Sequence, residues 1–521
     1  NNLKTGSICD LRWPMSGHLH NEAIVSKTKY DALVQQKKEL EETLAELKSL
    51  LIEQREANAE LRALVKGLQQ QLFGKKSEKL RPMPSVEQEL RRKGKRRRTA
   101  AQASQTRKEN AELRRQLPEV ISEIPVPEEE AVCPQCGNDK LRQVGEGKRT
   151  TEYEYVPARM VRKTYIQQTL ACDCGEYIVT APAPQRVVEG GQYGPGFFSH
   201  VITSKCSDSI PLHRQEKQFQ RLGIPVARAT LVDQFHRAAE LLQPLSNRLL
   251  ELIAQSKLVQ ADETTLKIQN TGKCRTGYLW TFLNGKLIGY RYSPSRSGQT
   301  PVEVLGGGEG TLVVDGYSGY NRVFTPDGWS RAGCLAHVRR KFYESLDSSP
   351  DEARQAMDLI LEVYRVEHLA KELGIVGTRK HFELRRKKSR PAMENFRKWL
   401  QEQEGLHPPK SPLGKAVAHA LKNWEALTEF LKSSKTPVDN NASERALRVA
   451  ALGRKNFLFS GHDQGAQNLA GLYSVVMTCE ANGVNPQQYL ADVLLRIQTH
   501  PASKIDEILP HKWRPPNDHS Q

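Results

Sequence analysis

The sequence predicts a protein of several domains, in which helical segments flank an α/β core that is itself interrupted by helices. Three observations carry this prediction. The chain has 521 residues, more than one ordinary domain contains. A heptad repeat runs near the N-terminus, and strand-like apolar runs alternate with helical runs in the second half. Residues 1–25 show no periodicity and are left unassigned.

The chain is strongly basic. Lys and Arg number 77 against 60 Asp and Glu, which gives a net charge of +17. Clustered excess charge of this sign favours a polyanionic partner, with nucleic acid as the default; the alternative is a merely soluble basic protein. The nine cysteines do not form the pattern of a disulfide framework. No apolar run approaches the roughly 20 residues that cross a bilayer, and no signal peptide opens the sequence, so we expect a soluble cytoplasmic protein without a membrane partner.

Residues 26–74 carry the heptad repeat, and nine of its twelve a and d positions are apolar. This pattern predicts a coiled coil, and Asn58 at an a position favours a defined register and a dimer. The alternative is a long amphipathic helix that packs on its own domain. The d positions are Leu33, Leu40, Leu47, Gln54, Leu61 and Leu68, and the a positions are Lys37, Leu44, Leu51, Asn58, Val65 and Leu72.

A basic segment follows at 75–125. Seven of the eight residues from 91 to 98 are basic, which indicates a flexible arm that orders on DNA phosphates. A solvated linker is an equally good interpretation. The basic residues are Arg91, Arg92, Lys93, Lys95, Arg96, Arg97 and Arg98.

Two pairs of cysteines define a small β domain at 126–190. Cys133 and Cys136 form one pair, Cys172 and Cys174 form the other, and the runs 151–156 and 159–166 between them are expected to be strands. Four thiolates at two glycine-containing turns are typical of one closed, structural Zn²⁺ site. Free thiols are the alternative, and the short spacing of the second pair makes it the weaker half of the pattern.

A helical region is expected at 191–250. A short helix over 211–221 ends at Leu222-Gly223, and a second helix begins near Ala227. This arrangement fits a DNA-binding helix-turn-helix, although helical hairpins without DNA are common.

The segment 251–460 is expected to hold the α/β core. A strand over 258–264 contains Asp262, and strands over 277–283 and 287–292 are joined by an Asn284-Gly285 turn. A fourth, buried strand ends in Asp315. In a sheet where the first and fourth strands are neighbours, the two carboxylates would share one edge and bridge Mg²⁺. Each aspartate alone is more often a cap or turn residue.

Glu444 is the third candidate carboxylate. It follows a turn with helix-capping residues and begins a helix on which Arg448 shares its face, in a position to hold a DNA phosphate, with Arg454 and Lys455 just beyond. The alternative for Glu444 is an ordinary ion pair with Arg448. Between Asp315 and Glu444 lie enough residues for a mainly helical insertion at about 342–435. Helices and a tail are expected over 461–521.

These stretches together resemble the insertion sequence 66 family of transposases. The resemblance implies a leucine zipper, a zinc domain, a helix-turn-helix-like region and an RNase H-like catalytic domain. It assigns an Asp-Asp-Glu triad to Asp262, Asp315 and Glu444. It also implies small accessory proteins from the same element. The matching stretches are 71–80, the pair Cys133 and Cys136, 211–233, 262–264, 315–320, 334–342 and 439–460.

The resemblance implies a bacterial DNA transposase that binds the ends of an insertion sequence and carries out strand cleavage and strand transfer into target DNA. Its cofactors would be two Mg²⁺ ions, for which Mn²⁺ substitutes, and the structural Zn²⁺. Its partners would be DNA and a second copy of the chain. The alternatives are a nuclease or resolvase without strand transfer and an inactive DNA-binding regulator. We expect Cys334 and His337 to have a structural role near the active site rather than to form a metal site of their own.

Overall fold

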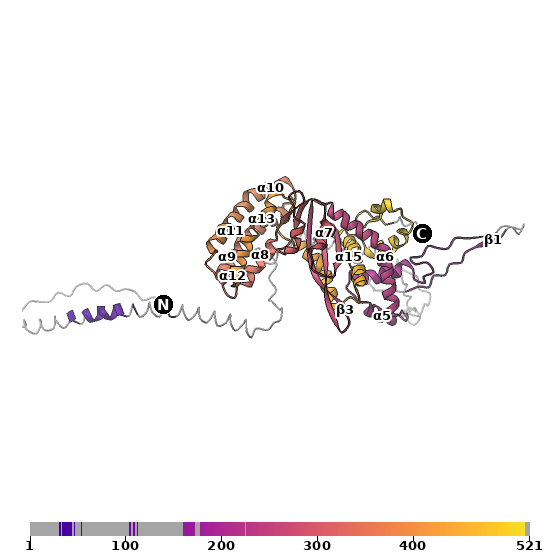
Figure 1. Ribbon diagram of the computed structural model, residues 1–521, viewed down its shortest axis with the longest axis horizontal. Helices are drawn as coiled ribbons and strands as arrows, with labels where there is room; N and C mark the ends of the chain where they lie inside the picture. Colours follow the sequence, from indigo (N-terminus) through magenta and orange to yellow (C-terminus); the bar gives the residue numbers. More distant parts are fainter. Residues whose placement is uncertain are drawn as a thin grey trace, which may run out of the picture. The chain divides into compact units, whose positions relative to one another are not determined.

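The computed structural model describes residues 160–171, 178–224 and 226–515, with short helical stretches nearer the N-terminus (Figure 1). The chain divides into two units, Asn1–Pro82 and Met83–Gln521. The basic arm from Arg91 to Arg98 and the cysteines Cys133, Cys136, Cys172 and Cys174 lie outside the described residues. The described positions near the N-terminus are 31–32, 34–43, 46, 54, 104–105, 108–109 and 112.

In the first unit, residues 34–43 are helical, as the heptad repeat predicts. Lys37 and Glu41 form an ion pair between successive turns, with 3.8 Å between Nζ and Oε1. Leu40, at a d position, is exposed.

The second unit is built on a mixed five-stranded sheet. Its strand order is β5-β4-β3-β6-β7, so the first and fourth strands along the chain are neighbours. β3 pairs in parallel with β6, and β6 with β7, whereas β4 is antiparallel to both β3 and β5. The strands are β3 (Leu258–Asn270), β4 (Lys273–Asn284), β5 (Leu287–Ser293), β6 (Gly310–Val313) and β7 (Trp329–Ala332).

The predicted hairpin is confirmed, since β4 ends at Asn284 and Gly285 has a φ of 56° in the turn. A positive φ at this point is the conformation that the tight turn requires and that glycine tolerates. β3 extends six residues beyond its expected end at 264. Leu266 and Ile268 account for the extension, because both side chains are buried against the helices that cover this part of the sheet.

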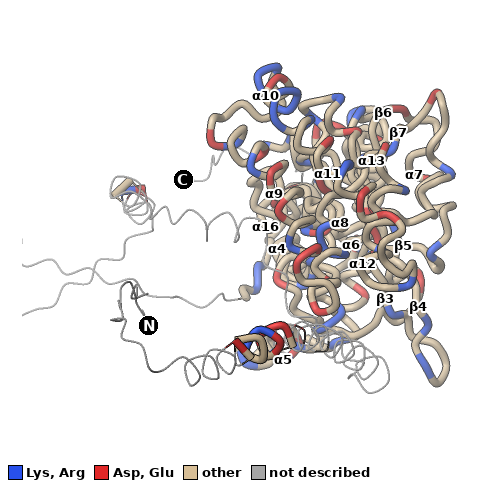
Figure 2. The backbone as a smooth tube through the Cα atoms, turned by 90° about the vertical axis from the view of Figure 1, so that its left-hand side faces the viewer, with Lys and Arg blue, Asp and Glu red and all other residues tan. Residues whose placement is uncertain are grey.

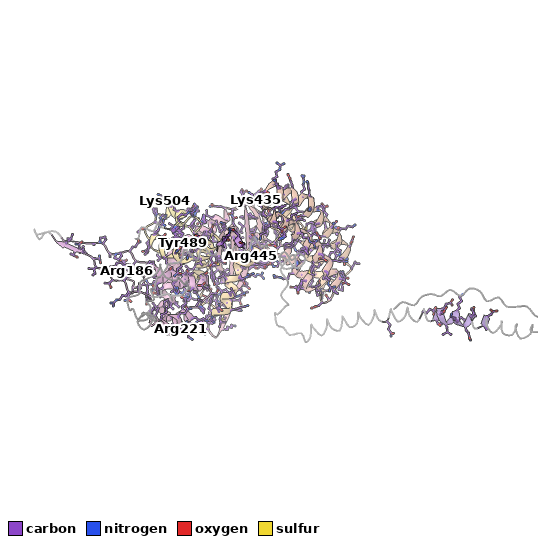
Figure 3. All side chains as sticks on the ribbon, turned by 180° about the vertical axis from the view of Figure 1, so that it is seen from behind. Arg186, Arg221, Lys435, Arg445, Tyr489 and Lys504 are labelled. Carbon is purple, nitrogen blue, oxygen red and sulfur yellow. The ribbon has the colours of Figure 1, made fainter. Side chains whose placement is uncertain are left out.

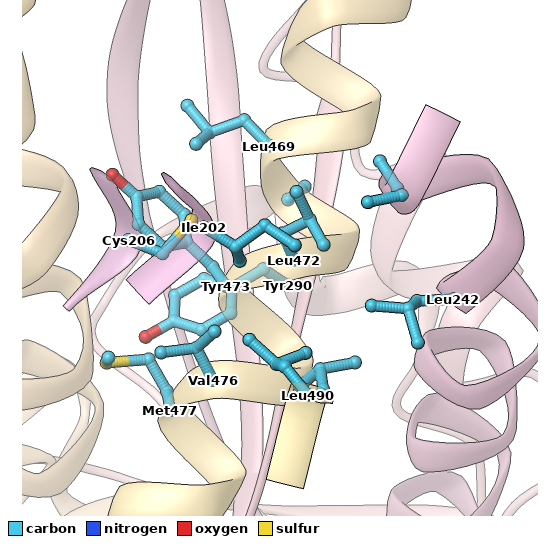
Figure 4. Close-up of a cluster of buried hydrophobic side chains, with 14 of the residues drawn as sticks. Ile202, Cys206, Leu242, Tyr290, Leu469, Leu472, Tyr473, Val476, Met477 and Leu490 are labelled. Atoms are coloured by element: carbon cyan, nitrogen blue, oxygen red, sulfur yellow. The ribbon is translucent and has the colours of Figure 1, made fainter. Parts of the chain in front are cut away.

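One face of the sheet packs on helices from both ends of the unit. Tyr290 of β5 lies beside Tyr473 and Leu472 of α15 (Asp463–Ala481) in this core, with Leu242 of α6 (Arg228–Ala254) across from them (Figure 4). The core also includes α4 (Pro195–Cys206), α14 (Asn441–Phe457) and α16 (Pro486–Arg496).

The opposite face of the sheet forms a separate core. Val259 and Ala261 of β3 pack there with Trp280 and Phe282 of β4, against α7 (Gln299–Leu305) and the short helix η2 (Ser318–Arg322). Alternate residues of a strand point to opposite faces. Asp262, between Ala261 and Glu263, is therefore directed to the α14 side of the sheet.

Between β7 and α14 the chain forms a helical bundle with its own core (Figure 1). The expected start of these helices at about 342 is too late, because Leu335, Val338 and Phe342 of the first helix already supply that core. The helices are α8 (Leu335–Glu344), α9 (Pro350–Glu372), α10 (Arg379–Leu384), the π-helical turn η3 (Arg385–Ser389), α11 (Arg390–Gln403), α12 (Pro412–Lys422), α13 (Trp424–Thr428) and η4 (Glu429–Lys432).

The remaining described elements are helices, except for one small hairpin. α5 (Leu212–Arg221) and the start of α6 at Arg228 confirm the two helices expected around Gly223, and η5 (Ala502–Ile508) follows α16. The expected strand over 159–166 is wrong in its described part, 160–166, which is irregular. The hairpin comes later, as β1 (Thr169–Ala171) and β2 (Ile178–Thr180). No helix in the described ranges is long and apolar enough to cross a membrane.

Candidate active site

Asp262 and Asp315 come from neighbouring parallel strands. The register pairs Leu258 with Thr311 and Gln260 with Val313. Asp262 and Asp315 each lie two residues beyond the last of these pairs, so they occupy equivalent positions at the point where β6 ends. The prediction of a shared edge assumes that the first and fourth strands are neighbours, and the pairing of β3 with β6 confirms this.

Glu444 reaches the same side of the sheet from the first turn of α14. Burial, together with the neighbouring charges of Glu263, Asp315 and Glu444, raises the pKa of Asp262 to about 7. The two other candidate carboxylates are therefore close enough to Asp262 to disfavour its ionised form. A hydrogen bond of 2.9 Å from the backbone NH of Glu263 to Asp262 acts in the opposite direction.

Two side chains of α8 hold the Glu444 carboxylate. His337 Nε2 lies 3.7 Å from Oε1, and Arg340 Nη2 lies 3.8 Å from Oε2. Within the described ranges, no three His, Cys, Asp or Glu side chains are arranged so that they would hold a metal ion. The carboxylates thus share one region without converging on a point. This is physically reasonable, because three acids repel one another and Glu444 has the guanidinium of Arg340 beside it on α8.

The donor set fits a hard divalent cation. Asp262, Asp315 and Glu444 offer only carboxylate oxygens, which Mg²⁺ and Mn²⁺ prefer over softer ions. The pKa of Asp262 is raised mainly by burial and in smaller part by the acids around it, a combination that is frequent at functional sites.

Asn440 connects three elements beside these carboxylates, and it is fully buried. Its Nδ2 donates to the carbonyl of Ala261, 2.7 Å away, and its Oδ1 accepts from Gln260 Nε2 at 3.3 Å. Its backbone NH donates to Cys334 Sγ at 3.2 Å, and its carbonyl accepts from the NH of Glu444 at 3.3 Å. One residue therefore ties β3 and the start of α8 to the helix that carries Glu444.

The turn before this helix is bonded as expected, since Asp439 Oδ1 accepts from the NH of Asn441 at 3.1 Å, but the N-cap residue itself provides no side-chain cap. Asn440 occupies the N-cap position of α14, but its side chain makes no capping bond. The amide is engaged with β3 instead, and Ser443 Oγ donates back to the Asn440 carbonyl at 2.9 Å. Capping is predicted from local sequence, whereas the side chain of Asn440 donates to Ala261, 179 residues earlier in the chain.

Asp439 and Cys334 support the same loop from inside. Tyr364 of α9 donates to Asp439 Oδ2 at 3.0 Å, and Asn441 Nδ2 donates to the same oxygen at 2.7 Å. Burial raises the pKa of the Cys334 thiol to about 12, so it stays protonated at neutral pH. Cys334 contacts Asn440 and His337 contacts Glu444, so both lie beside the candidate site, and their structural role stays a prediction.

Glu263 lies on the opposite face from Asp262. Its side chain is 2% exposed, accepts from Tyr320 at 2.7 Å and is paired with Arg296, with 2.8 Å between Nε and Oε1. Arg296 in turn lies 3.9 Å from the centre of the Tyr317 ring. Adjacent strand residues thus serve different roles, and Asp262 is the one that faces α14.

Arg331 and His419 are neighbours of Asp315 that the sequence does not reveal. Arg331 donates to the carbonyls of Asp315 and Tyr317. His419 of α12 packs on Gly316, where a Cβ would lie 2.9 Å from its Cε1. Burial, aided by the charge of Lys341, lowers the pKa of His419 to about 4, so the imidazole is neutral. Both residues come from elements whose local patterns are ordinary, and only the tertiary fold brings them here.

The predicted DNA contacts on α14 differ in their surroundings. Arg448 and Lys455 are exposed, as is Arg445, the residue after Glu444 (Figure 3). Arg454 Nη1 donates to the carbonyl of Thr265 at 2.8 Å, so this guanidinium also fastens α14 to β3.

Comparison with protein families gives three matches along the chain. The family model described as "Transposase IS66 family" matches residues 190–468, which include all three candidate carboxylates. A model described as the "IS66 C-terminal element" matches 474–511. A "zinc-finger binding domain of transposase IS66" matches 130–175, the segment with Cys133, Cys136, Cys172 and Cys174.

Similar proteins occur in Sinorhizobium fredii (strain NBRC 101917 / NGR234). The uncharacterized protein y4hP is 30% identical over 441 residues, covering 80% of this chain and 79% of its own. The uncharacterized protein y4jD is 32% identical over 402 residues, covering 73% and 78% respectively. The uncharacterized protein y4qI is 30% identical over 416 residues, covering 76% of each chain.

Proposed function

The chain belongs to the IS66 family of transposases, and from that premise we propose that it cleaves DNA at the ends of an insertion sequence and joins those ends to target DNA. The proposed catalytic residues are Asp262, Asp315 and Glu444. The observation that carries the assignment is their common location. Two of them extend from paired parallel strands, and the third is delivered to the same side of the sheet by α14.

We further propose that the core has the RNase H-like fold. In support, β4 alone runs against the other four strands, and the first and fourth strands lie side by side. Because β3 and β6 are neighbours, Asp262 and Asp315 can lie at the same edge of the sheet. The helical bundle between β7 and α14 corresponds to the insertion expected between Asp315 and Glu444.

The three carboxylates would hold the metal ions. When bound, two Mg²⁺ or Mn²⁺ ions would activate the attacking oxygen and stabilise the leaving oxygen of the phosphodiester. The protein's own part is to present the ligands. Asp262 gives up its proton, and His337 and Arg340 hold Glu444 at the edge of the site. Asn440 fixes the loop before Glu444 against β3.

The other segments are assigned to recognition and assembly. Cys133, Cys136, Cys172 and Cys174 would hold one Zn²⁺, and the zinc-finger match over their segment supports this. The arm from Arg91 to Arg98, the α5–α6 pair, and Arg448 and Lys455 would contact DNA. The heptad segment would make the protein a dimer or larger oligomer, and small proteins of the same element would be further partners.

The test is cleavage of a labelled element end with Mg²⁺ or Mn²⁺, followed by joining to a target plasmid. Asp262→Asn, Asp315→Asn and Glu444→Gln nearly preserve side-chain size but remove a charge that the metal requires. Each should abolish cleavage and joining and leave binding of the end unchanged in a gel-shift assay.

Glu263→Gln is the matched control, because Glu263 faces the other side of the sheet. It should retain cleavage. Full activity in any triad variant would remove that residue from the site. Cleavage without joined products would instead assign a nuclease or resolvase, and end binding without either reaction would assign a regulator.

A further inference from the structure

Exposed basic residues gather on one end of the helical bundle, around α10, η3 and the start of α11 (Figure 2). The central group, which we call the basic turn, consists of Arg386, Lys387, Lys388 and Arg390. All four are exposed, and no acidic side chain among the described residues forms an ion pair with any of them. Arg379 and Lys380 of α10 extend the positive surface, and Arg379 is paired with Glu383.

The basic turn has an unusual backbone. Residues Arg385–Ser389 form a π-helical turn between α10 and α11. Such turns are rare and are frequently found at functional sites. Arg386 and Arg390 are like charges four residues apart, a spacing that destabilises a helix without a compensating partner. Something must therefore hold this turn in place.

Arg385 holds the turn from inside. Its side chain is only 1% exposed and is paired with Glu367 of α9, with 2.7 Å between Nη2 and Oε2. Its Nη1 donates to three carbonyls, those of Phe430, Ser433 and Thr436, at 2.7 to 2.9 Å. Arg385 is thus buried and anchors the turn, whereas the three residues that follow it, Arg386 to Lys388, are exposed to solvent.

The same anchor connects the basic turn to the candidate active site. Thr436, which binds Arg385, lies three residues before Asp439. On α9, Tyr364 binds Asp439 and Glu367 binds Arg385, and these two residues are one helical turn apart on one face. The basic turn and the loop that leads to Glu444 are thus held by adjacent positions of a single helix.

We propose that the basic turn is a second DNA-binding surface, which holds the phosphate backbone of duplex DNA next to the segment bound at the carboxylates. Unpaired, exposed Lys and Arg side chains on a fixed turn suit phosphate oxygens, and such contacts carry no sequence information. The proposal rests on the proposed function only for the choice of DNA as the polyanion. A bound phosphate backbone would also relieve the repulsion within the turn.

The experiment compares two variants of the full chain with equal loss of charge. The first is Arg386→Gln/Lys387→Gln/Lys388→Gln. The control is Lys286→Gln/Arg322→Gln/Lys504→Gln, which removes three exposed bases from three separate places, the β4–β5 turn, η2 and η5; Lys504 is labelled in Figure 3. Binding to a duplex of random sequence is measured over a range of salt concentrations.

The first variant should flatten the slope of log affinity against log salt by about 2.7, at about 0.9 for each lost phosphate contact. The control should change the slope by less than about 1. Equal changes in both variants would show that overall charge alone matters, and an unchanged slope in the first would also overturn the proposal.

Lysine acylation of the unaltered chain provides a second measurement that does not depend on a variant folding. Bound duplex should protect Lys387 and Lys388 and leave Lys286 and Lys504 reactive. Equal reactivity of Lys387 and Lys388 with and without DNA would contradict the proposal. Neither measurement requires cleavage, so a chain that binds here but never cuts would disprove the proposed function and leave this inference standing.

Discussion

Asp262 is a carboxyl group whose protonation reports on the candidate site. Burial and three neighbouring acids raise its pKa to about 7, from a usual value of 3.8. A carboxyl with a raised pKa contributes its full stability to the fold below its unfolded pKa, and that contribution is lost as the pH rises through the folded value. In the metal-free protein this loss should fall between about pH 4 and pH 7.

Asp262→Asn should therefore stabilise the metal-free protein more at pH 8 than at pH 5, because the amide cannot ionise. We expect a rise in Tm of at least about 2 °C at pH 8 and a smaller one at pH 5, measured by thermal unfolding in the presence of a chelator. Asp327→Asn, at an exposed acid, is the control and should have no such pH dependence. The same shift in Tm at both pH values would mean that Asp262 is ionised throughout.

At this scale the sequence predicts the acids but not their neighbours. Asp262 and Asp315 stand out because each lies at or near the end of a predicted strand, and Glu444 because it follows a capping turn. His419 and Arg340 lie on helices with ordinary patterns. Their positions beside the acids depend on how these helices pack in the folded protein, and local sequence patterns do not predict that packing.

At the scale of elements, Asn440 joins β3, α8 and α14. Asn440→Ala removes the donor to the Ala261 carbonyl and loosens the loop before Glu444. Residues that orient ligands in this way typically account for about 10- to 100-fold in metal affinity or activity. We expect cleavage to fall by about that factor and the Mn²⁺ concentration for half-maximal cleavage to rise.

Asn456→Ala is the matched control on the same helix. It also removes one amide-to-carbonyl bond, the 2.9 Å contact from Asn456 Nδ2 to Ser209, but at the far end of α14. It should destabilise the protein, though less than Asn440→Ala, which also loses the bond from Gln260, and it should leave the Mn²⁺ dependence unchanged. If both variants shift the Mn²⁺ requirement equally, Asn440 acts through stability alone.

Turn chemistry explains which elements the sequence predicts well. The β4–β5 hairpin and the α5–α6 pair each have a glycine with positive φ in their connection, at Gly285 and Gly223. The extension of β3 and the early start of the bundle at α8 depend instead on burial against distant helices. The strand expected over 159–166 is the opposite kind of error, because residues that favour strands, such as Val161, Thr164 and Tyr165, do not pair over the described part, 160–166.

At the scale of the whole molecule, the heptad segment should determine assembly. Changing Leu40, Leu47 and Leu61 to Gln removes three d positions from the apolar seam and should reduce the mass measured by light scattering from that of an oligomer to that of a monomer. Glu42→Gln/Glu56→Gln, at outward f positions of the same repeat, should leave the mass unchanged. An unaltered mass in the leucine variant would place the oligomer interface elsewhere.

The hydrogen bond between Asn440 and Ala261 also bears on when, during synthesis and folding, the candidate active site is completed. It closes a loop of 179 residues, and contacts so distant in sequence form late in folding. In a chain that is being synthesised, Asp262 and Asp315 are made well before Glu444, which lies 129 residues after Asp315. At about 5–20 residues per second, synthesis of that interval takes on the order of ten seconds. Under the proposed function, the growing chain would then present its expected DNA-binding segments without the third carboxylate, so the order of the residues in the gene would delay cutting until α14 has been made.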